Sequence, residues 1–267
     1  MPNKDLSLLN IDKPSGPTSF QISDFIRKSL NLKKTSHMGT LDPKVTGVLP
    51  ITLGRACRLS EYFMHKDKTY VGIMRLRENV EEKKLKEEIK KFVGKITQLP
   101  PVRSSVKRAE RVREVKTFKI LEIEDKNIMF ETQVEAGTYI RKLIHDLGER
   151  IGGAHMLELR RTKAGIFSET DENFITLYEF EKALKENYLD KYLIPAEDAI
   201  KKVLPFVQIN DEDLKHLLTG KPLMKKDFKD KIPKDEVFSA FIGERFIGVY
   251  KKFEDGDIVA KAEFVFN

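Results

Sequence analysis

The chain has 267 residues, of which 40% are hydrophobic and 34% are charged, and its formal net charge is +7. This composition can bury a sizeable core, and the basic balance indicates a polyanionic partner. The single cysteine excludes an intrachain disulfide and favours a reducing, cytoplasmic setting, while no apolar run approaches the length of a membrane span.

The spacing of apolar residues predicts alternating strands and helices in the first 200 or so residues. A strand is expected over 6–11, a helix capped by Thr18 or Ser19 follows, and 46–62 mixes strand and helix. Further elements are expected in chain order: a strand over 70–76, a helix over 80–93, a hairpin of 117–124 with 128–134, and helices over 139–151, 176–187 and 195–203.

The pattern changes after Leu204-Pro205, where a short helix over 211–218 precedes a hairpin and a last strand over 258–266. From Phe206 onward there are 11 Lys/Arg and 12 Asp/Glu, so the preceding 205 residues carry a net charge of +8. These observations predict two domains, 1–203 and 204–267, with the positive field on the larger one.

One carboxylate, Asp42, lies in a run that has Gly39 and Gly47 near its ends and Pro43 directly after the acid. Glycine permits backbone conformations closed to other residues, and proline restrains itself and its predecessor. A carboxylate held in this way has a fixed direction, as a catalytic group requires. Taken alone, the run is equally typical of a surface Asp-Pro turn.

Other segments of the chain also have two readings. Tyr70 could fill the core of a strand, and Arg141 could be a surface helix residue. The stretch 103–119 holds 7 basic and 2 acidic residues and is either a solvated face or a phosphate-binding surface. Five histidines and one cysteine show no zinc-ligand spacing, and no phosphate-binding glycine loop is present.

In their order along the chain, these segments resemble the TruB/dyskerin class of pseudouridine synthases, in particular its archaeal branch, which supplies the catalytic subunit of box H/ACA ribonucleoproteins. The resemblance covers roughly residues 6–203 and rests on the segments 12–20, 37–47, 68–72, 100–107, 135–143 and 153–161. The remainder resembles a short PUA domain, with 206–224 matching its opening.

The resemblance implies an α+β catalytic domain with a mixed, mainly antiparallel sheet flanked by helices, followed by a small, mostly β, PUA-like domain. The family's reaction breaks the bond between uracil N1 and the ribose and rejoins the base through C5, without a metal or an organic cofactor. Asp42 would be the essential carboxylate, either as a nucleophile at the ribose or as a base that removes a ribose proton.

The resemblance also implies roles for other residues. Arg141 and Tyr70 would be catalytic residues together with Asp42: Arg141 would pair with Asp42, and Tyr70 would stack on the target base. The substrate-binding residues implied by the resemblance are His37, Tyr139, Leu159, Arg103 and Lys107. Lys13 and Pro14 match a motif that would support the active site from below.

Three functions fit these features. The first is an isomerase of rRNA uridines that works with a guide RNA and the small proteins of the H/ACA particle. The second is a stand-alone enzyme for the T-loop uridine of tRNA, and the third is a non-catalytic RNA-binding scaffold. The short spacing between Gly72 and Pro100 favours the guided type, because the stand-alone branch typically carries an inserted RNA-clamping element.

Overall fold

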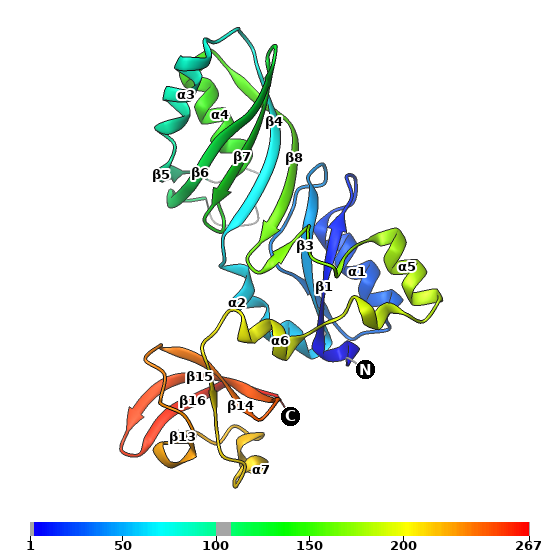
Figure 1. Cartoon of the computed structure of the whole chain (residues 1–267), viewed down its shortest axis with the longest axis vertical. Helices are drawn as coiled ribbons and strands as arrows, with labels where there is room; N and C mark the ends of the chain where they lie inside the picture. Colours follow the sequence, from blue (N-terminus) through cyan, green and yellow to red (C-terminus); the bar gives the residue numbers. More distant parts are fainter. Residues whose placement is uncertain (1–2, 100–107, 267) are drawn as a thin grey trace. The chain divides into compact units, whose positions relative to one another are not determined.

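The computed structural model describes residues 3–99 and 108–266, and its contacts divide the chain into two units, Asn3–Leu193 and Ile194–Asn267 (Figure 1). Within these described residues, no helix is both long and apolar enough to cross a membrane.

The larger unit is built on one long sheet with the strand order β10-β1-β3-β8-β4-β7-β6-β5. Its main strands are β1 (Ser7–Lys13), β3 (Thr46–Leu53), β4 (Lys68–Leu76), β5 (Gly94–Gln98), β6 (Arg111–Glu124), β7 (Asn127–Val134), β8 (Ala154–Ala164) and β10 (Phe174–Thr176). Along this order neighbouring strands are antiparallel except at β1–β10 and β3–β8. The expected mixed, mainly antiparallel sheet is therefore confirmed.

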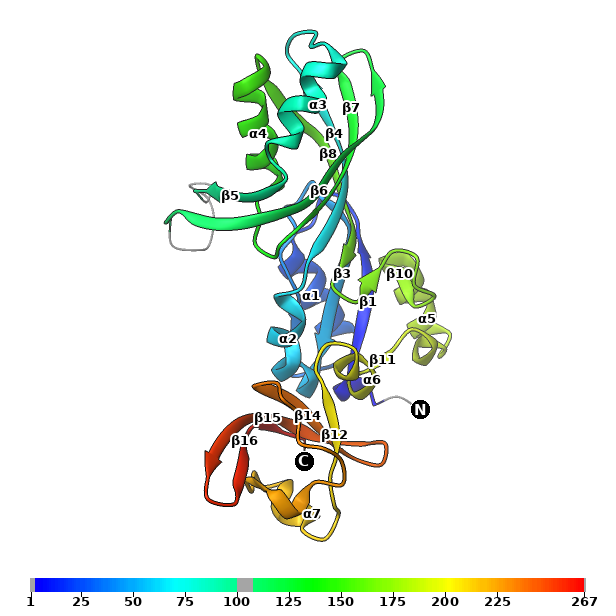
Figure 2. The same cartoon turned by 60° about the vertical axis from the view of Figure 1, so that its left-hand side comes forward.

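Two further short strands of this unit belong to the same sheet. They are β2 (Thr35–His37), which pairs with β3, and β9 (Phe167–Ser168), which pairs with β8. The helices of this unit are α1 (Ser19–Ser29), α2 (Ser60–Met64), α3 (Glu82–Lys90), α4 (Ile140–Ile151) and α5 (Leu177–Lys185), and Figure 2 shows their places along the sheet.

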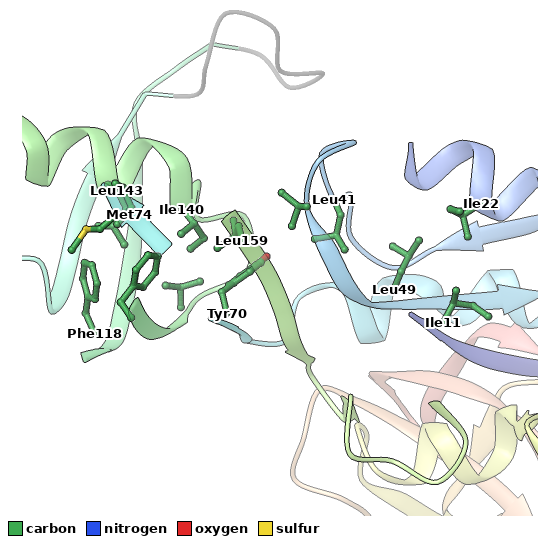
Figure 3. Packing of buried hydrophobic residues seen from close by; sticks show 14 of the residues in the cluster. Ile11, Ile22, Leu41, Leu49, Tyr70, Met74, Phe118, Ile140, Leu143 and Leu159 are labelled. Atoms are coloured by element: carbon green, nitrogen blue, oxygen red, sulfur yellow. The ribbon is translucent and has the colours of Figure 1, made fainter. Parts of the chain in front are cut away.

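Apolar stripes of α1 and α4 pack into a core that follows the sheet (Figure 3). Ile22 and Ile26 of α1, and Leu143 and Leu147 of α4, are no more than 2% exposed. Burial of such a side chain contributes about 1.5–3 kcal/mol. The start of α1 is fixed by a capping box in which the N-cap is Thr18, one of the two residues that the sequence offered.

The sequence prediction missed β8, which lies between β3 and β4 in the sheet. Its segment reads as a charged stretch because Arg160 and Arg161 interrupt the apolar alternation. Arg160 is compensated by ion pairs with Asp12 at 3.0 Å and Glu169 at 2.8 Å, and Arg161 is buried on backbone carbonyls. Strand β6 also begins earlier than expected, because its first residues pair with β5.

The smaller unit contains a five-stranded sheet with the order β12-β14-β15-β16-β13. The strands are β12 (Phe206–Gln208), β13 (Leu223–Met224), β14 (Val237–Ile242), β15 (Arg245–Asp255) and β16 (Ile258–Val265), with helices α6 (Ala196–Lys201) and α7 (Leu214–Leu217). The hairpin across Gly243-Glu244 is confirmed. Phe238 and Tyr250, both fully buried, stack with an interplanar angle of 18° in its core.

Candidate active site

The segment that carries Asp42 connects β2 to β3, and both of its glycines have backbone conformations that other residues rarely adopt. The φ angles of Gly39 and Gly47 are +104° and +101°. A Cβ atom at Gly47 would lie 2.2 Å from the carbonyl oxygen of Arg161 in β8. Glycine at this position therefore allows the segment to approach the central strand of the sheet.

Two apolar side chains fix the segment to the core on either side of Asp42. Leu41 is 4% exposed and Val45 is 6% exposed. The Ser19 hydroxyl, on the first turn of α1, donates to the Leu41 carbonyl at 3.0 Å and accepts from its N–H at 2.8 Å. The backbone next to Asp42 is thus held by packing and by a pair of buried hydrogen bonds.

Lys13, the last residue of β1, supports the same segment from inside the protein. Its Nζ donates to the carbonyls of Pro14 at 2.8 Å, Pro43 at 2.9 Å and Val45 at 2.8 Å, and the residue has no exposed surface. Burial lowers the pKa of Lys13, and the nearby charge of Asp42 partly opposes that shift. Two charge-assisted hydrogen bonds, to Pro43 and Val45, therefore join the end of β1 to the backbone that directly follows Asp42.

Arg161 holds the two ends of the segment together, a role that the sequence did not reveal. Its Nε donates to the Val48 carbonyl at 2.8 Å and its Nη2 to the Gly39 carbonyl at 3.0 Å. The residue is 1% exposed. The available signal was the pair Arg160-Arg161 within one segment, because an arginine that becomes buried on a strand needs buried acceptors.

A third buried cation, Lys68 at the start of β4, lies near Gly39. A Cβ atom at Gly39 would be 3.8 Å from the Lys68 Cε. Burial lowers the pKa of Lys68 to about 8, with a further contribution from the Arg161 charge. Its Nζ donates to the carbonyls of Met64 and Lys66. Lys68 thus places a further buried positive charge next to the segment, and backbone carbonyl dipoles stabilise that charge.

The side chain of Asp42 points away from this support and forms an ion pair with Arg141 of α4. The Asp42 Oδ2 lies 2.8 Å from the Arg141 Nη2. The two side chains are 48% and 61% exposed, so the carboxylate is accessible from solvent although its backbone is fixed. The structure thus brings together the acid and the arginine that the sequence analysis paired.

A buried glutamine, Gln98, fixes the beginning of α4 and was not predicted. Its Oε1 accepts from the Tyr139 N–H at 3.0 Å, and its Nε2 donates to the Tyr139 carbonyl at 3.2 Å. Gln98 is 2% exposed and ends β5. Because Tyr139 is the N-cap of α4, this contact sets the position from which Arg141 reaches Asp42.

Tyr70 and Leu159 form an apolar wall on neighbouring strands. They are 8% and 9% exposed and belong to one buried cluster with Leu41. Leu159 pairs with Gly72 across β8 and β4, and a Cβ atom at Gly72 would lie 3.0 Å from its Cδ1. Figure 3 shows Tyr70 beside Leu159, with its hydroxyl on the side that faces Leu41.

The remaining predicted substrate-binding residues lie in three kinds of place. His37 ends β2 and is half-buried, and its Nδ1 is buried without a hydrogen-bond partner among the described residues. Burial, and secondarily the charge of Arg161, lowers the pKa of His37. Tyr139 is half-buried at the start of α4. Arg103 and Lys107 lie outside the described residues.

The basic stretch around β6 is partly neutralised within the described chain. Arg113 lies 3.6 Å from Glu135, and Lys116 pairs with Asp67.

No group of His, Cys, Asp and Glu that could hold a metal ion is found in residues 3–99 and 108–266. The candidate site is therefore a fixed, solvent-accessible carboxylate with an arginine partner and an aromatic, apolar wall. Such a carboxylate can act as a nucleophile or as a general base.

Two family models match consecutive parts of this chain. The model of the TruB family pseudouridylate synthase N-terminal domain matches residues 27–89 and 77–140. The model of the tRNA pseudouridylate synthase B C-terminal domain matches residues 141–201. A probable tRNA pseudouridine synthase B from Methanothermobacter thermautotrophicus is 42% identical over 228 residues, which are 82% of this chain and 69% of that protein.

A second relative of the same name, from Pyrococcus horikoshii, is 46% identical over 76% of this chain, and the match spans 63% of its own length. The crystal structure of a Cbf5-Nop10-Gar1 complex is similar with a TM-score of 0.87 and 37% identity, over 98% of this chain and 85% of that chain. An H/ACA ribonucleoprotein bound to a substrate RNA containing 2'-deoxyuridine matches with a TM-score of 0.86 and 35% identity, over 99% of this chain and 86% of that chain. This chain belongs to the TruB family of pseudouridine synthases.

Proposed function

We propose that this chain converts specific uridines of RNA to pseudouridine, with Asp42 as the catalytic carboxylate and with rRNA presented by a box H/ACA guide RNA. The observation that supports the proposal most directly is the ion pair of Asp42 with Arg141 on a rigid, glycine-flanked segment. A fixed and oriented carboxylate lowers the barrier because the reacting groups do not have to be ordered in the transition state.

In this proposal the apolar wall receives the base once it has left its stack. Tyr70 stacks on the uracil, and Tyr139 and Leu159 shield it from water. Stacking of a base on an aromatic side chain contributes about 1–3 kcal/mol. His37, Arg103 and Lys107 bind the RNA around the target. Asp42 then acts either by attack on the ribose or by removal of a ribose proton.

The similar structures support the proposal that the enzyme is directed by a guide RNA. They are complexes of Cbf5 with Nop10 and Gar1 and an H/ACA ribonucleoprotein, so the proposed partners of this chain are a guide RNA and small proteins of that particle. Between β4 and β6 the described residues contain one helix, α3, and one strand, β5, which leaves little room for a clamping insertion. We place the enzyme in the cytoplasm.

The smaller unit has the proposed role of a PUA-like RNA-binding domain over residues 204–267. Its almost neutral charge supports recognition of RNA through a shaped surface more than through a general field. A tRNA substrate is the second candidate, because the two relatives described above are named as probable tRNA pseudouridine synthases.

The decisive experiment replaces Asp42 with Asn and measures pseudouridine formation and RNA affinity. We expect the loss of product with RNA affinity retained, because the amide keeps the shape of the side chain and removes its nucleophilic or basic character. Asp146→Asn is the matched control, since Asp146 is paired with Lys142 on the same helix as Arg141. Undiminished activity of Asp42→Asn would refute the assignment.

A second experiment separates guided from stand-alone action. The wild-type protein is assayed on free tRNA, and on an rRNA fragment with guide RNA and the small partner proteins. Guide-dependent turnover supports the proposal. Full turnover of free tRNA, together with no guide-dependent activity, would contradict it and favour the second candidate.

A further inference from the structure

A cavity beside the Asp42 segment has no role in the chemistry described above. It lies between α1 and β2, and its lining includes the aromatic ring of Phe20, the basic residues Lys33 and Lys34, and the polar residues Ser36 and His37. Arg27 and Asp24 also border it, but they are paired with each other at 2.8 Å.

Both α1 and β2, which line this cavity, are connected to the segment that carries Asp42, α1 by hydrogen bonds and β2 along the chain. Phe20 follows Ser19, whose hydroxyl is hydrogen-bonded to the backbone of Leu41. His37 ends β2, five residues before Asp42. Figure 3 shows Leu41 on this segment together with Ile22 on α1, the helix that forms one wall. A ligand of the cavity would therefore lie next to the proposed uridine site.

The side chains that line the cavity have the chemistry that binds single-stranded nucleic acid. Phe20 is 70% exposed, more than any other phenylalanine among the described residues. Lys33 and Lys34 form no ion pair with any described residue, and both are exposed. An exposed aromatic ring with unpaired cations beside it provides a stacking surface for a base and contacts for its phosphates.

His37 also lines the cavity, and its buried Nδ1 has no hydrogen-bond partner among the described residues. A buried polar atom without a partner costs free energy unless a ligand or water satisfies it. A small inorganic anion could pair with Lys33 and Lys34 but would make no stacking contact with the ring of Phe20. A nucleotide accounts for the ring, the cations and the polar wall together.

We infer that this cavity binds a second nucleotide of the substrate strand, directly beside the uridine presented to Asp42, with its base on Phe20 and its phosphates at Lys33 and Lys34. The inference rests on the proposed function and extends it, because it assigns a specificity-determining contact outside the uridine pocket. It implies that the enzyme holds the strand next to the flipped uridine as well as at the uridine itself.

The test measures binding of short single-stranded RNAs that contain one uridine to the Asp42→Asn protein, so that the result does not depend on turnover. One RNA is intact, and a second has abasic sites at the two nucleotides that flank the uridine. We expect Phe20→Ala to weaken binding of the intact RNA about 10-fold and to have no effect on the abasic RNA, because the stacking partner is already absent. Tyr178→Ala, on α5, is the matched control, since Tyr178 is 75% exposed.

The charge contribution is tested separately through the salt dependence of binding. Replacing Lys33 and Lys34 together by Gln should reduce the slope of log K against log salt by about 1.4, or 0.7 for each cation. The matched control replaces the exposed Lys182 and Lys185 of α5 in the same way and should leave the slope unchanged.

Three outcomes would overturn the inference, and a fourth concerns the proposed function alone. Equal losses for the intact and abasic RNAs, or equal effects of the cavity variants and their α5 controls, would overturn it. Loss of association with the small partner proteins, with RNA binding unchanged, would also overturn it and assign the cavity to an acidic protein segment. Absence of pseudouridine formation by the wild-type protein, with the Phe20 effect intact, would refute the proposed function alone.

Discussion

The buried Lys68 should make the stability of the larger unit rise with pH above neutrality. Its pKa in the folded protein is about 8, whereas an unfolded lysine has a pKa of about 10.4. Between these values the unfolded state binds more protons than the folded state, so the free energy of unfolding increases with pH. From pH 7 to pH 9.5 this linkage amounts to about 2 kcal/mol.

The assay is urea-induced unfolding at pH 7 and pH 9.5, followed by circular dichroism, for the wild-type protein and for Lys68→Met. We expect the variant to lose about 2 kcal/mol of the pH-dependent increase, because methionine fills the same volume and has no proton to release. Taking the difference between the two proteins removes the contributions of other titrating groups.

Lys185→Met is the control for the same substitution at an exposed position. It should keep the wild-type pH dependence. If Lys68→Met shows the same increase as the wild type, Lys68 does not titrate in this range, and its burial on backbone carbonyls does not have the stated electrostatic consequence.

Two further predictions concern the support of the Asp42 segment. Gly47→Ala should lower the free energy of unfolding by at least about 2 kcal/mol, measured by urea unfolding. The new Cβ would clash with the Arg161 carbonyl oxygen, and alanine is strained at a φ of +101°. Gly94→Ala is its control, with a φ of +105° and no atom within 4 Å of the Cβ, and equal losses in the two variants would show that the close approach is irrelevant. Lys13→Met should lower kcat about 100-fold with RNA affinity kept, because the backbone next to Asp42 loses its donor, and an unchanged kcat would argue against a positioning role.

The sequence was sufficient for the elements whose signals are local. The N-cap at Thr18, the apolar stripe of α4 and the glycine that ends α4 each act within one or two helical turns, so they can be read without a partner. The hairpin of β6 and β7 and that of β14 and β15 have the same local character, since a tight turn joins two alternating segments.

Strand β8 was not predictable in this way. Its polar residues are explained only by partners far along the chain, such as Asp12 for Arg160 and the carbonyl of Gly39 for Arg161. A charged residue in a central strand is costly until its acceptors are in place, and only the folded sheet supplies them.

For the candidate site, the sequence by itself supplied the residue types and their order, including Asp42 between its glycines and the arginine of α4. It thereby identified the family and the chemistry to expect. What only the tertiary structure decided is how Asp42 is held: by Lys13 from β1, by Arg161 from β8 and by Arg141 from α4, three cations that are 29, 119 and 99 positions away in the chain. The physical reason is that backbone carbonyls and carboxylates select their cationic partners by distance in space, and spacing along the sequence carries no information about that distance.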